Sequence, residues 1–184
     1  MVESRIDHAK RKRVAEMSPE EMRLALLVSE KTGLPNRRAF DEAEPTTWVA
    51  MCDCNGLKAM NDKYGFRAGD TLIQRLAEVM EEVGLDAYHN QGDEFLVLGD
   101  SYRDLDAKLG ETERRLRSNP FVVHSMHDVV VPINGTVFSY GIGCTLKEAE
   151  TSLKHQKEIR KVERQKQTGL QLVCCCHRNT EREI

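Results

Sequence analysis

Apolar residues recur along the chain at two different spacings. An unbroken apolar run from Trp48 to Cys52 is typical of a buried strand, which we expect over residues 46–54. Between residues 70 and 83 the apolar positions stand three or four apart, which predicts an amphipathic helix. The inward face of that helix consists of Leu72, Ile73, Leu76, Val79, Met80 and Val83. Together the two patterns predict a sheet with helices packed against it.

Weaker signals extend this arrangement to both sides. Ser18 and Glu21 form a capping box, and further helices are expected over residues 19–30, 37–44, 102–118 and 147–167. A hairpin is predicted over 87–98, with its turn at Gln91 and Gly92. A second antiparallel pair is expected between 121–131 and 136–142, around Asn134 and Gly135. The order of elements places the chain in the α/β (α+β) class. It is compatible with a ferredoxin-like palm, a mostly antiparallel sheet with flanking helices.

Composition excludes several classes of function. The chain has 184 residues, 40% of them hydrophobic, and a net charge of -3, which gives no general attraction to nucleic acid or anionic membranes. No apolar run reaches the roughly 20 residues of a spanning helix, and no secretory signal begins the chain. We therefore expect a cytoplasmic protein with its six cysteines as free thiols. Residues 1–24 are expected to form a polar, helical extension, and residues 169–184 a cysteine-rich, disordered tail.

Three acidic residues stand at the ends of predicted strands. Asp53 ends the buried strand, and Asp93 and Glu94 open the second arm of the hairpin. If the two elements are neighbours, the carboxylates converge and need a compensating cation. Oxygen ligands of this kind suit Mg²⁺ or Mn²⁺. From their spacing alone, simple solvation of these carboxylates at the surface is the favoured interpretation.

Five segments resemble, in order, the motifs of the GGDEF diguanylate cyclase family. Residues 91–95 are similar to its signature, with Gln91 in place of the first glycine. The other four segments are 32–38, 53–62, 64–70 and 139–143. The resemblance implies a GGDEF domain over 25–168, with the ferredoxin-like palm of nucleotidyl cyclases. It also implies that two GTP molecules are joined into cyclic di-GMP with release of pyrophosphate, at the interface of a homodimer.

The same resemblance implies roles in metal binding and catalysis for individual residues. Asp53 and Glu94, with the backbone carbonyl of Cys54, would bind the Mg²⁺ or Mn²⁺ ions. Asp93 would assist deprotonation of the attacking 3′-hydroxyl. Lys157 would reach the phosphates from the last helix.

Further positions match substrate contacts of the family. Asn61 and Asp70 match the guanine-reading residues, although Asp70 is also suited to cap the following helix. Leu57 and Lys58 lie in a turn whose backbone N–H groups would hold the phosphates. Gly92 in the signature turn is a further substrate-binding position. Lys161 stands where the family usually has arginine, and a solvated helix face is the alternative for it.

Other positions depart from the family pattern. Gln91 puts a side chain where glycine allows close approach of the ligand. Ser29 replaces an aspartate, which weakens an expected ion pair with Arg37 or Arg38, and His89 replaces an arginine. Besides an active cyclase, these departures leave open a degenerate module that binds GTP or cyclic di-GMP and regulates a partner.

Overall fold

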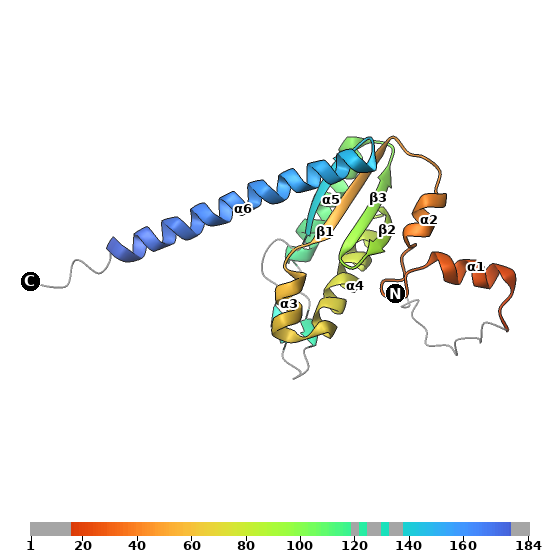
Figure 1. Ribbon diagram of the computed structural model, residues 1–184, viewed down its shortest axis with the longest axis horizontal. Helices are drawn as coiled ribbons and strands as arrows, with labels where there is room; N and C mark the ends of the chain where they lie inside the picture. Colours follow the sequence, from red (N-terminus) through yellow and green to blue (C-terminus); the bar gives the residue numbers. More distant parts are fainter. Residues whose placement is uncertain (1–15, 119–121, 125–129, 133–137, 178–184) are drawn as a thin grey trace, which may run out of the picture.

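The computed structural model describes residues 16–118, 122–124, 130–132 and 138–177. Its centre is a four-stranded sheet in the order β2-β3-β1-β6, with every neighbouring pair antiparallel (Figure 1). The strands are β1 (Trp48–Cys54), β2 (Asp86–Gln91), β3 (Glu94–Gly99) and β6 (Phe138–Gly143). The predicted antiparallel sheet and the hairpin are therefore confirmed.

The predicted second strand pair is wrong. Strand β4 (Val122–His124) pairs instead with β5 (Val130–Pro132) in a separate two-stranded sheet. Strand β6 joins the main sheet beside β1. The pattern of apolar residues in β6 fits pairing with the preceding segment 121–131 as well as pairing with β1. The sequence pattern therefore did not distinguish a local hairpin from a distant pairing.

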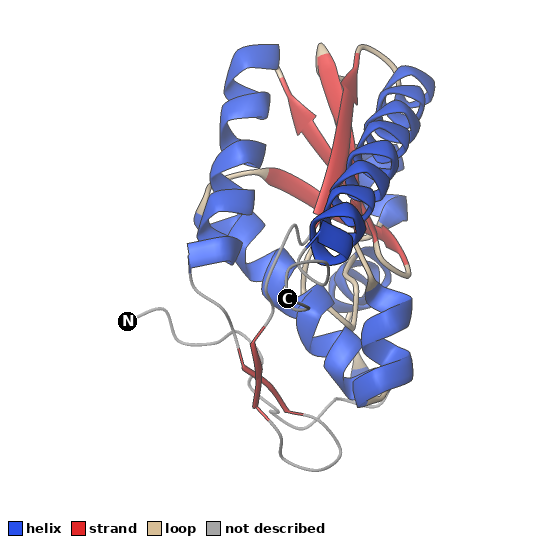
Figure 2. Cartoon of the chain, turned by 90° about the vertical axis from the view of Figure 1, so that its left-hand side faces the viewer, coloured by secondary structure: helices blue, strands red, loops and turns tan. Residues whose placement is uncertain are grey.

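Helices lie on both sides of the main sheet (Figure 2). On one side pack α4 (Phe66–Glu82) and α5 (Tyr102–Ser118), whose leucines share one core with Ala50, Cys52 and Phe95. On the other side lies α6 (Leu146–His177). Its Ala149 and Leu153 backbones lie so close to Gly141 that a Cβ there would overlap them. This close contact places one face of α6 directly over β6 and β1.

The remaining helices are short, and one of them was not predicted. Helix α1 (Pro19–Leu27) begins at the expected capping box, and α2 (Arg37–Glu42) follows it. Helix α3 (Leu57–Tyr64) begins in the predicted phosphate-binding turn, where no helix was expected. Helix α6 continues to His177, so residues 169–177 are helical rather than disordered. Residues 1–15 and 178–184 of the predicted extension and tail lie outside the described residues.

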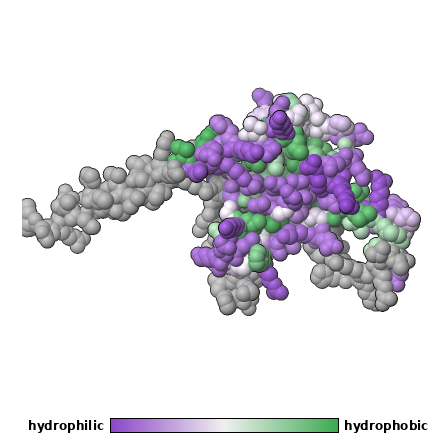
Figure 3. All heavy atoms as spheres, in the orientation of Figure 1, coloured by the Kyte–Doolittle hydropathy of each residue, from purple (hydrophilic) through white to green (hydrophobic). Residues whose placement is uncertain are grey.

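The surface in Figure 3 is mostly hydrophilic, with small hydrophobic areas. Helix α1 contributes the exposed side chains of Leu24 and Leu26. Within the described part of the chain, no helix combines the length and the apolar character that crossing a membrane requires.

Candidate active site

The predicted acidic residues come together at one end of the sheet. Asp53, near the end of β1, is the direct register partner of Glu94 at the start of β3. The backbone N–H of Cys54 donates to the carbonyl oxygen of Asp93 at 3.1 Å, which joins the strand end to the hairpin turn. The structure thus brings three carboxylates to one edge, as the neighbouring-strand hypothesis requires.

Two polar side chains compensate these carboxylates. The Nζ atom of Lys157 lies 2.6 Å from Oδ1 of Asp53, so α6 delivers its lysine to the end of β1. Asn90 donates from Nδ2 to Oε2 of Glu94 at 2.8 Å. Burial and then the charge of Asp53 raise the pKa of Asp93 above its usual value. Among these contacts, Lys157 is the one cation, so the site keeps an excess of negative charge.

The Cys54 side chain is not suited to bind a metal. It is buried, and burial, followed by the charge of Asp93, raises the pKa of its thiol. A protonated thiol is a poor metal ligand, which leaves the backbone carbonyl as the group that Cys54 could offer. Among the described residues, no group of three or more His, Cys, Asp or Glu side chains is arranged to hold a metal ion. Any metal site here would therefore combine two carboxylates with main-chain oxygen.

Lys161 and Arg160 lie one turn beyond Lys157. Lys161 is exposed. Arg160, which no sequence motif marks, donates from Nη1 to the carbonyl of Phe138 at 3.0 Å and to Oγ of Ser139 at 2.8 Å. These bonds tie α6 to β6 next to the site, so Arg160 helps to set the position of Lys157.

Asn61 lies where α3 packs against α4. Its Oδ1 atom is buried without a hydrogen-bond partner in the described structure. An unpaired buried amide oxygen is costly, so the atom is well suited to accept a hydrogen bond from a ligand. A Cβ at Gly69 on α4 would overlap this oxygen and contact Leu57 at 2.8 Å. Glycine at position 69 therefore makes the room that Asn61 occupies.

Asp70 lies inside α4 and does not cap it, because Gly65 holds the N-cap position. The capping alternative is therefore wrong. Oδ1 of Asp70 lies 2.7 Å from Nζ of Lys31. Lys31 stands directly before the first motif, and no pattern in the sequence marks it as a site residue. Its partner is 39 residues away, too far for any local pattern to reveal the pair.

Leu57 and Lys58 are the first two residues of α3, after Gly56 in the left-handed conformation at φ 75°. The N–H groups of a first helical turn have no partners within the helix and attract anions. The predicted phosphate-binding turn is thus a helix N-terminus. It offers the same backbone donors with a favourable helix dipole.

The signature turn is fixed by His89. Gln91 belongs to β2 and pairs with Glu94, while the left-handed residue of the turn is Gly92 at φ 56°. The buried His89 ring contacts the Gly92 carbonyl through Nε2 at 3.1 Å and Ser29 Oγ through Nδ1 at 2.7 Å. A proton on Nε2 satisfies both contacts. Ser29 and His89, which both depart from the family pattern, are therefore hydrogen-bonded to each other.

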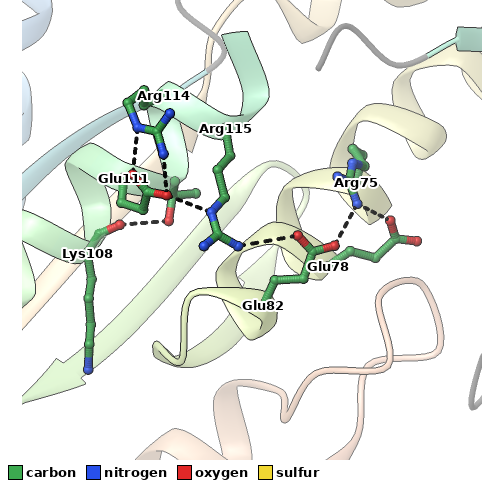
Figure 4. A network of polar contacts seen from close by, with 8 residues as sticks. Arg75, Glu78, Glu82, Lys108, Glu111, Arg114 and Arg115 are labelled. Carbon is green, nitrogen blue, oxygen red and sulfur yellow. Dashed lines mark hydrogen bonds and ion pairs between the residues drawn. The ribbon is translucent and has the colours of Figure 1, made fainter. Parts of the chain in front are cut away.

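A group of ion pairs lies on the helices α4 and α5 (Figure 4). On α4, Arg75 contacts Glu78 at 3.0 Å and Glu82 at 3.1 Å. Arg115 on α5 contacts Glu82 at 3.8 Å and Glu111 at 2.7 Å. The network links the two helices on the side of the sheet that faces away from α6.

Comparison with known proteins identifies this arrangement. Residues 28–171 match the family described as "Diguanylate cyclase, GGDEF domain". This match covers well over half of the chain, and the chain belongs to the GGDEF diguanylate cyclase family.

Two curated relatives carry the same family name. Diguanylate cyclase DgcZ of Escherichia coli K12 is 29% identical over 58% of this chain and 40% of its own length. Diguanylate cyclase VdcA of Vibrio cholerae is 35% identical over 36% of this chain and 23% of its own length. This chain therefore matches less than half of the length of either relative.

Solved structures show the same fold. The GGDEF domain of DgcB from Caulobacter crescentus, in complex with c-di-GMP, superposes with a TM-score of 0.63 at 20% identity, over 72% of this chain and 90% of that one. Diguanylate cyclase SiaD of Pseudomonas aeruginosa, in complex with its activator SiaC, gives 0.60 at 22% identity, over 74% of this chain and 60% of that one. The predicted α+β palm with its antiparallel sheet is thus confirmed.

Proposed function

We propose that this chain is an active diguanylate cyclase. It joins two GTP molecules into cyclic di-GMP, with release of pyrophosphate and with Mg²⁺ or Mn²⁺ as cofactor. The observation that carries the proposal is the juxtaposition of Asp53 and Glu94 in one strand register, with Lys157 in contact with Asp53 at 2.6 Å. Carboxylates and a lysine so arranged are what phosphoryl transfer with a divalent cation needs.

The donor set fits a hard divalent cation. Asp53 and Glu94 offer carboxylate oxygens from adjacent strands, and the Cys54 carbonyl adds a main-chain oxygen. Mg²⁺ prefers such ligands and completes its shell with water and substrate phosphates. When bound, the cation polarises the phosphoryl oxygens and offsets the charge that develops on them.

The nucleotide would extend from this edge of the sheet toward α4. The backbone N–H groups of Leu57 and Lys58 would hold its terminal phosphates, with Lys157 and the more distant Lys161 adding positive charge. At the other end Asn61 would accept from the guanine N2 amino group. Asp70 would accept from guanine N1–H and N2–H₂, both of which adenine lacks.

Asp93 would accept the proton of the attacking 3′-hydroxyl. Its pKa is raised by burial and by Asp53, and a raised pKa makes a carboxylate a better base. Gly92, in the turn beside it, would let the ribose approach the hairpin. Each chain offers one such site, so joining two GTP molecules requires a homodimer in which the two sites face each other.

A binding module without turnover is the second candidate. Gln91 is exposed beside the site, and its side chain could obstruct the approach of a second GTP site. Such a module would still bind GTP or cyclic di-GMP through Asn61 and Asp70.

Product analysis separates the two candidates. Purified protein at high concentration is incubated with GTP and Mg²⁺, and the products are resolved by chromatography and mass spectrometry. Cyclic di-GMP and pyrophosphate are expected in a 1:2 ratio, because each new phosphodiester releases one pyrophosphate. GTP binding without any cyclic dinucleotide would favour the binding module, and Gln91→Gly should then restore turnover if Gln91 is the obstacle.

A further inference from the structure

Lys31 holds a position that none of the family motifs explains. Its Nζ atom lies 2.7 Å from Oδ1 of Asp70, the residue proposed to read guanine. The two side chains are 39% and 48% exposed. An ion pair this open to solvent adds little to stability, and it is accessible to a ligand. Stability is therefore a weak explanation for the contact.

The backbone around Lys31 is fixed on both sides. Gln74, one turn after Asp70 on α4, donates from Nε2 to the Lys31 carbonyl at 3.1 Å. The turn that contains Lys31 is closed by the Gly33 N–H to the Ser29 carbonyl at 2.9 Å and by the Ser29 N–H to the Leu34 carbonyl at 2.8 Å. The lysine is thus anchored beside α4, and its ammonium group reaches the Asp70 carboxylate from a defined direction.

The chemistry of guanine matches this pair of side chains. Along one edge of the base, the donors N2–H₂ and N1–H are followed by the acceptor O6. A carboxylate can accept from the two donors, and a lysine beside that carboxylate can donate to O6, since lysine pairs with guanine O6 and N7 in nucleic-acid recognition. Adenine carries an amino donor where guanine carries O6, so an ammonium group at that place disfavours adenine.

We propose that Lys31 is a specificity-determining residue that donates a hydrogen bond to guanine O6, beside Asp70. The inference rests on the proposed GTP site and extends it. Asp70 and Lys31 together read three consecutive groups of the base. Asn61, which faces α4 from α3, adds the buried acceptor Oδ1.

The test compares GTP with 6-thio-GTP, in which sulfur, a weak acceptor, replaces O6. Both are titrated calorimetrically into the full chain with Mg²⁺, below neutral pH, where N1 of both bases keeps its proton. Wild-type protein should bind GTP about tenfold tighter, as expected for one charge-assisted hydrogen bond. Lys31→Met should lose about tenfold in affinity for GTP and almost none for 6-thio-GTP, so that the preference disappears. Lys31→Arg should retain part of it.

Lys108→Met is the matched control. Lys108 contacts Asp104 at 3.0 Å, and the two side chains are 37% and 64% exposed, so this variant removes a similar ion pair from α5. It should bind both nucleotides like the wild type. Thermal unfolding of both methionine variants should match the wild type, which excludes a folding defect.

The outcomes separate this inference from the proposed function. If the wild type binds GTP but Lys31→Met weakens both nucleotides equally, or neither, the inference is wrong and the GTP site stands. An equal loss would mean that Lys31 only positions Asp70. If the wild type binds no guanine nucleotide, the proposed function and the inference both fall.

Discussion

The two ends of the candidate site are built in different ways. At the end proposed to bind the metal (the metal end), Asp53 and Glu94 are fixed by strand register, and the nearby Lys157 compensates part of their charge. At the end proposed to bind guanine (the base end), Asn61 stands on the short helix α3 with its Oδ1 atom buried and, in the described structure, without a hydrogen-bond partner. One end holds carboxylates that a single lysine partly compensates, whereas the other holds a buried amide oxygen that a ligand would satisfy.

This difference bears on how each end should respond to mutation. A carboxylate at the metal end contributes its negative charge to cation binding, so its loss should affect turnover much more than folding. A change at Gly69, where α4 packs against Asn61 of α3, alters the packing of the base end, so it should affect both folding and nucleotide affinity. The predictions below separate these two kinds of effect.

The largest effect is expected from Asp53 and Glu94, the proposed metal ligands. Asp53→Asn and Glu94→Gln keep the shape of the side chain but remove its charge. Each should lower Mg²⁺-dependent formation of cyclic di-GMP by on the order of a thousandfold, because a metal ligand is lost. The measurement is product formed per time at saturating Mg²⁺. Asp104→Asn, a surface carboxylate on α5, is the control and should keep full activity. Full activity in either of the first two variants would contradict the metal assignment.

Gly69→Ala tests the packing of the base end. Its new Cβ would overlap Oδ1 of Asn61, so α3 must shift. The free energy of unfolding should fall by about 1–3 kcal/mol, and GTP affinity should fall with it. Gly110→Ala is the matched control, because nothing lies within 4 Å of a Cβ there. It should raise the free energy of unfolding by about 0.5–1 kcal/mol. Denaturant unfolding measures both, and equal effects would contradict the proposed role of Gly69.

Lys157 and Lys161 should differ, although both lie on α6. Lys157 contacts Asp53 at 2.6 Å, so Lys157→Met should reduce turnover by about a hundredfold through lost stabilisation of the phosphates. Lys161 is exposed one turn further on, and Lys161→Met should cost only about threefold. Steady-state kinetics of both variants measure the difference. Equal losses would show that the helix presents both lysines to the substrate.

The smallest effect concerns pH and the hairpin. Burial lowers the pKa of His89 below the value of 6.5 for the unfolded chain. Between these two pKa values the unfolded state binds a proton that the folded state does not, so stability falls as the pH drops below about 6.5. His89→Gln should flatten this part of the profile, as measured by thermal unfolding at a series of pH values. An unchanged slope would mean that other groups cause it.

The sequence predicted the metal end better than the base end. The strand that carries Asp53 is an unbroken apolar run, and the hairpin that carries Glu94 has a clear turn signal. Their pairing follows once both lie in one sheet. Helix α3 was missed because it has only eight residues, and its apolar positions are too few to show a helical period. The contact between Lys31 and Asp70 depends on the packing of a distant turn against α4, which no local pattern records.

The segment before α6 shows a second limit of prediction from the sequence. The dipeptide Asn134-Gly135 is a strong hairpin signal, and it led to a local pairing for residues 136–142. Strand β6 pairs with β1 instead, and the close packing of α6 on Gly141 covers that edge of the sheet. The missed helix α3 and the strand β6, whose partner was predicted wrongly, both lie beside the site. The motifs therefore predicted which residues belong to the candidate site, but not how those residues are arranged.

One titration tests the central claim that both ends hold a single nucleotide. The affinity of the wild-type chain for GTP and for ATP is measured by calorimetry, with and without Mg²⁺. The account predicts that GTP binds at least about tenfold tighter than ATP, because only guanine offers the hydrogen-bond donors that Asp70 requires, and that removal of Mg²⁺ weakens GTP binding. Equal affinities for GTP and ATP, or GTP binding indifferent to Mg²⁺, would contradict it.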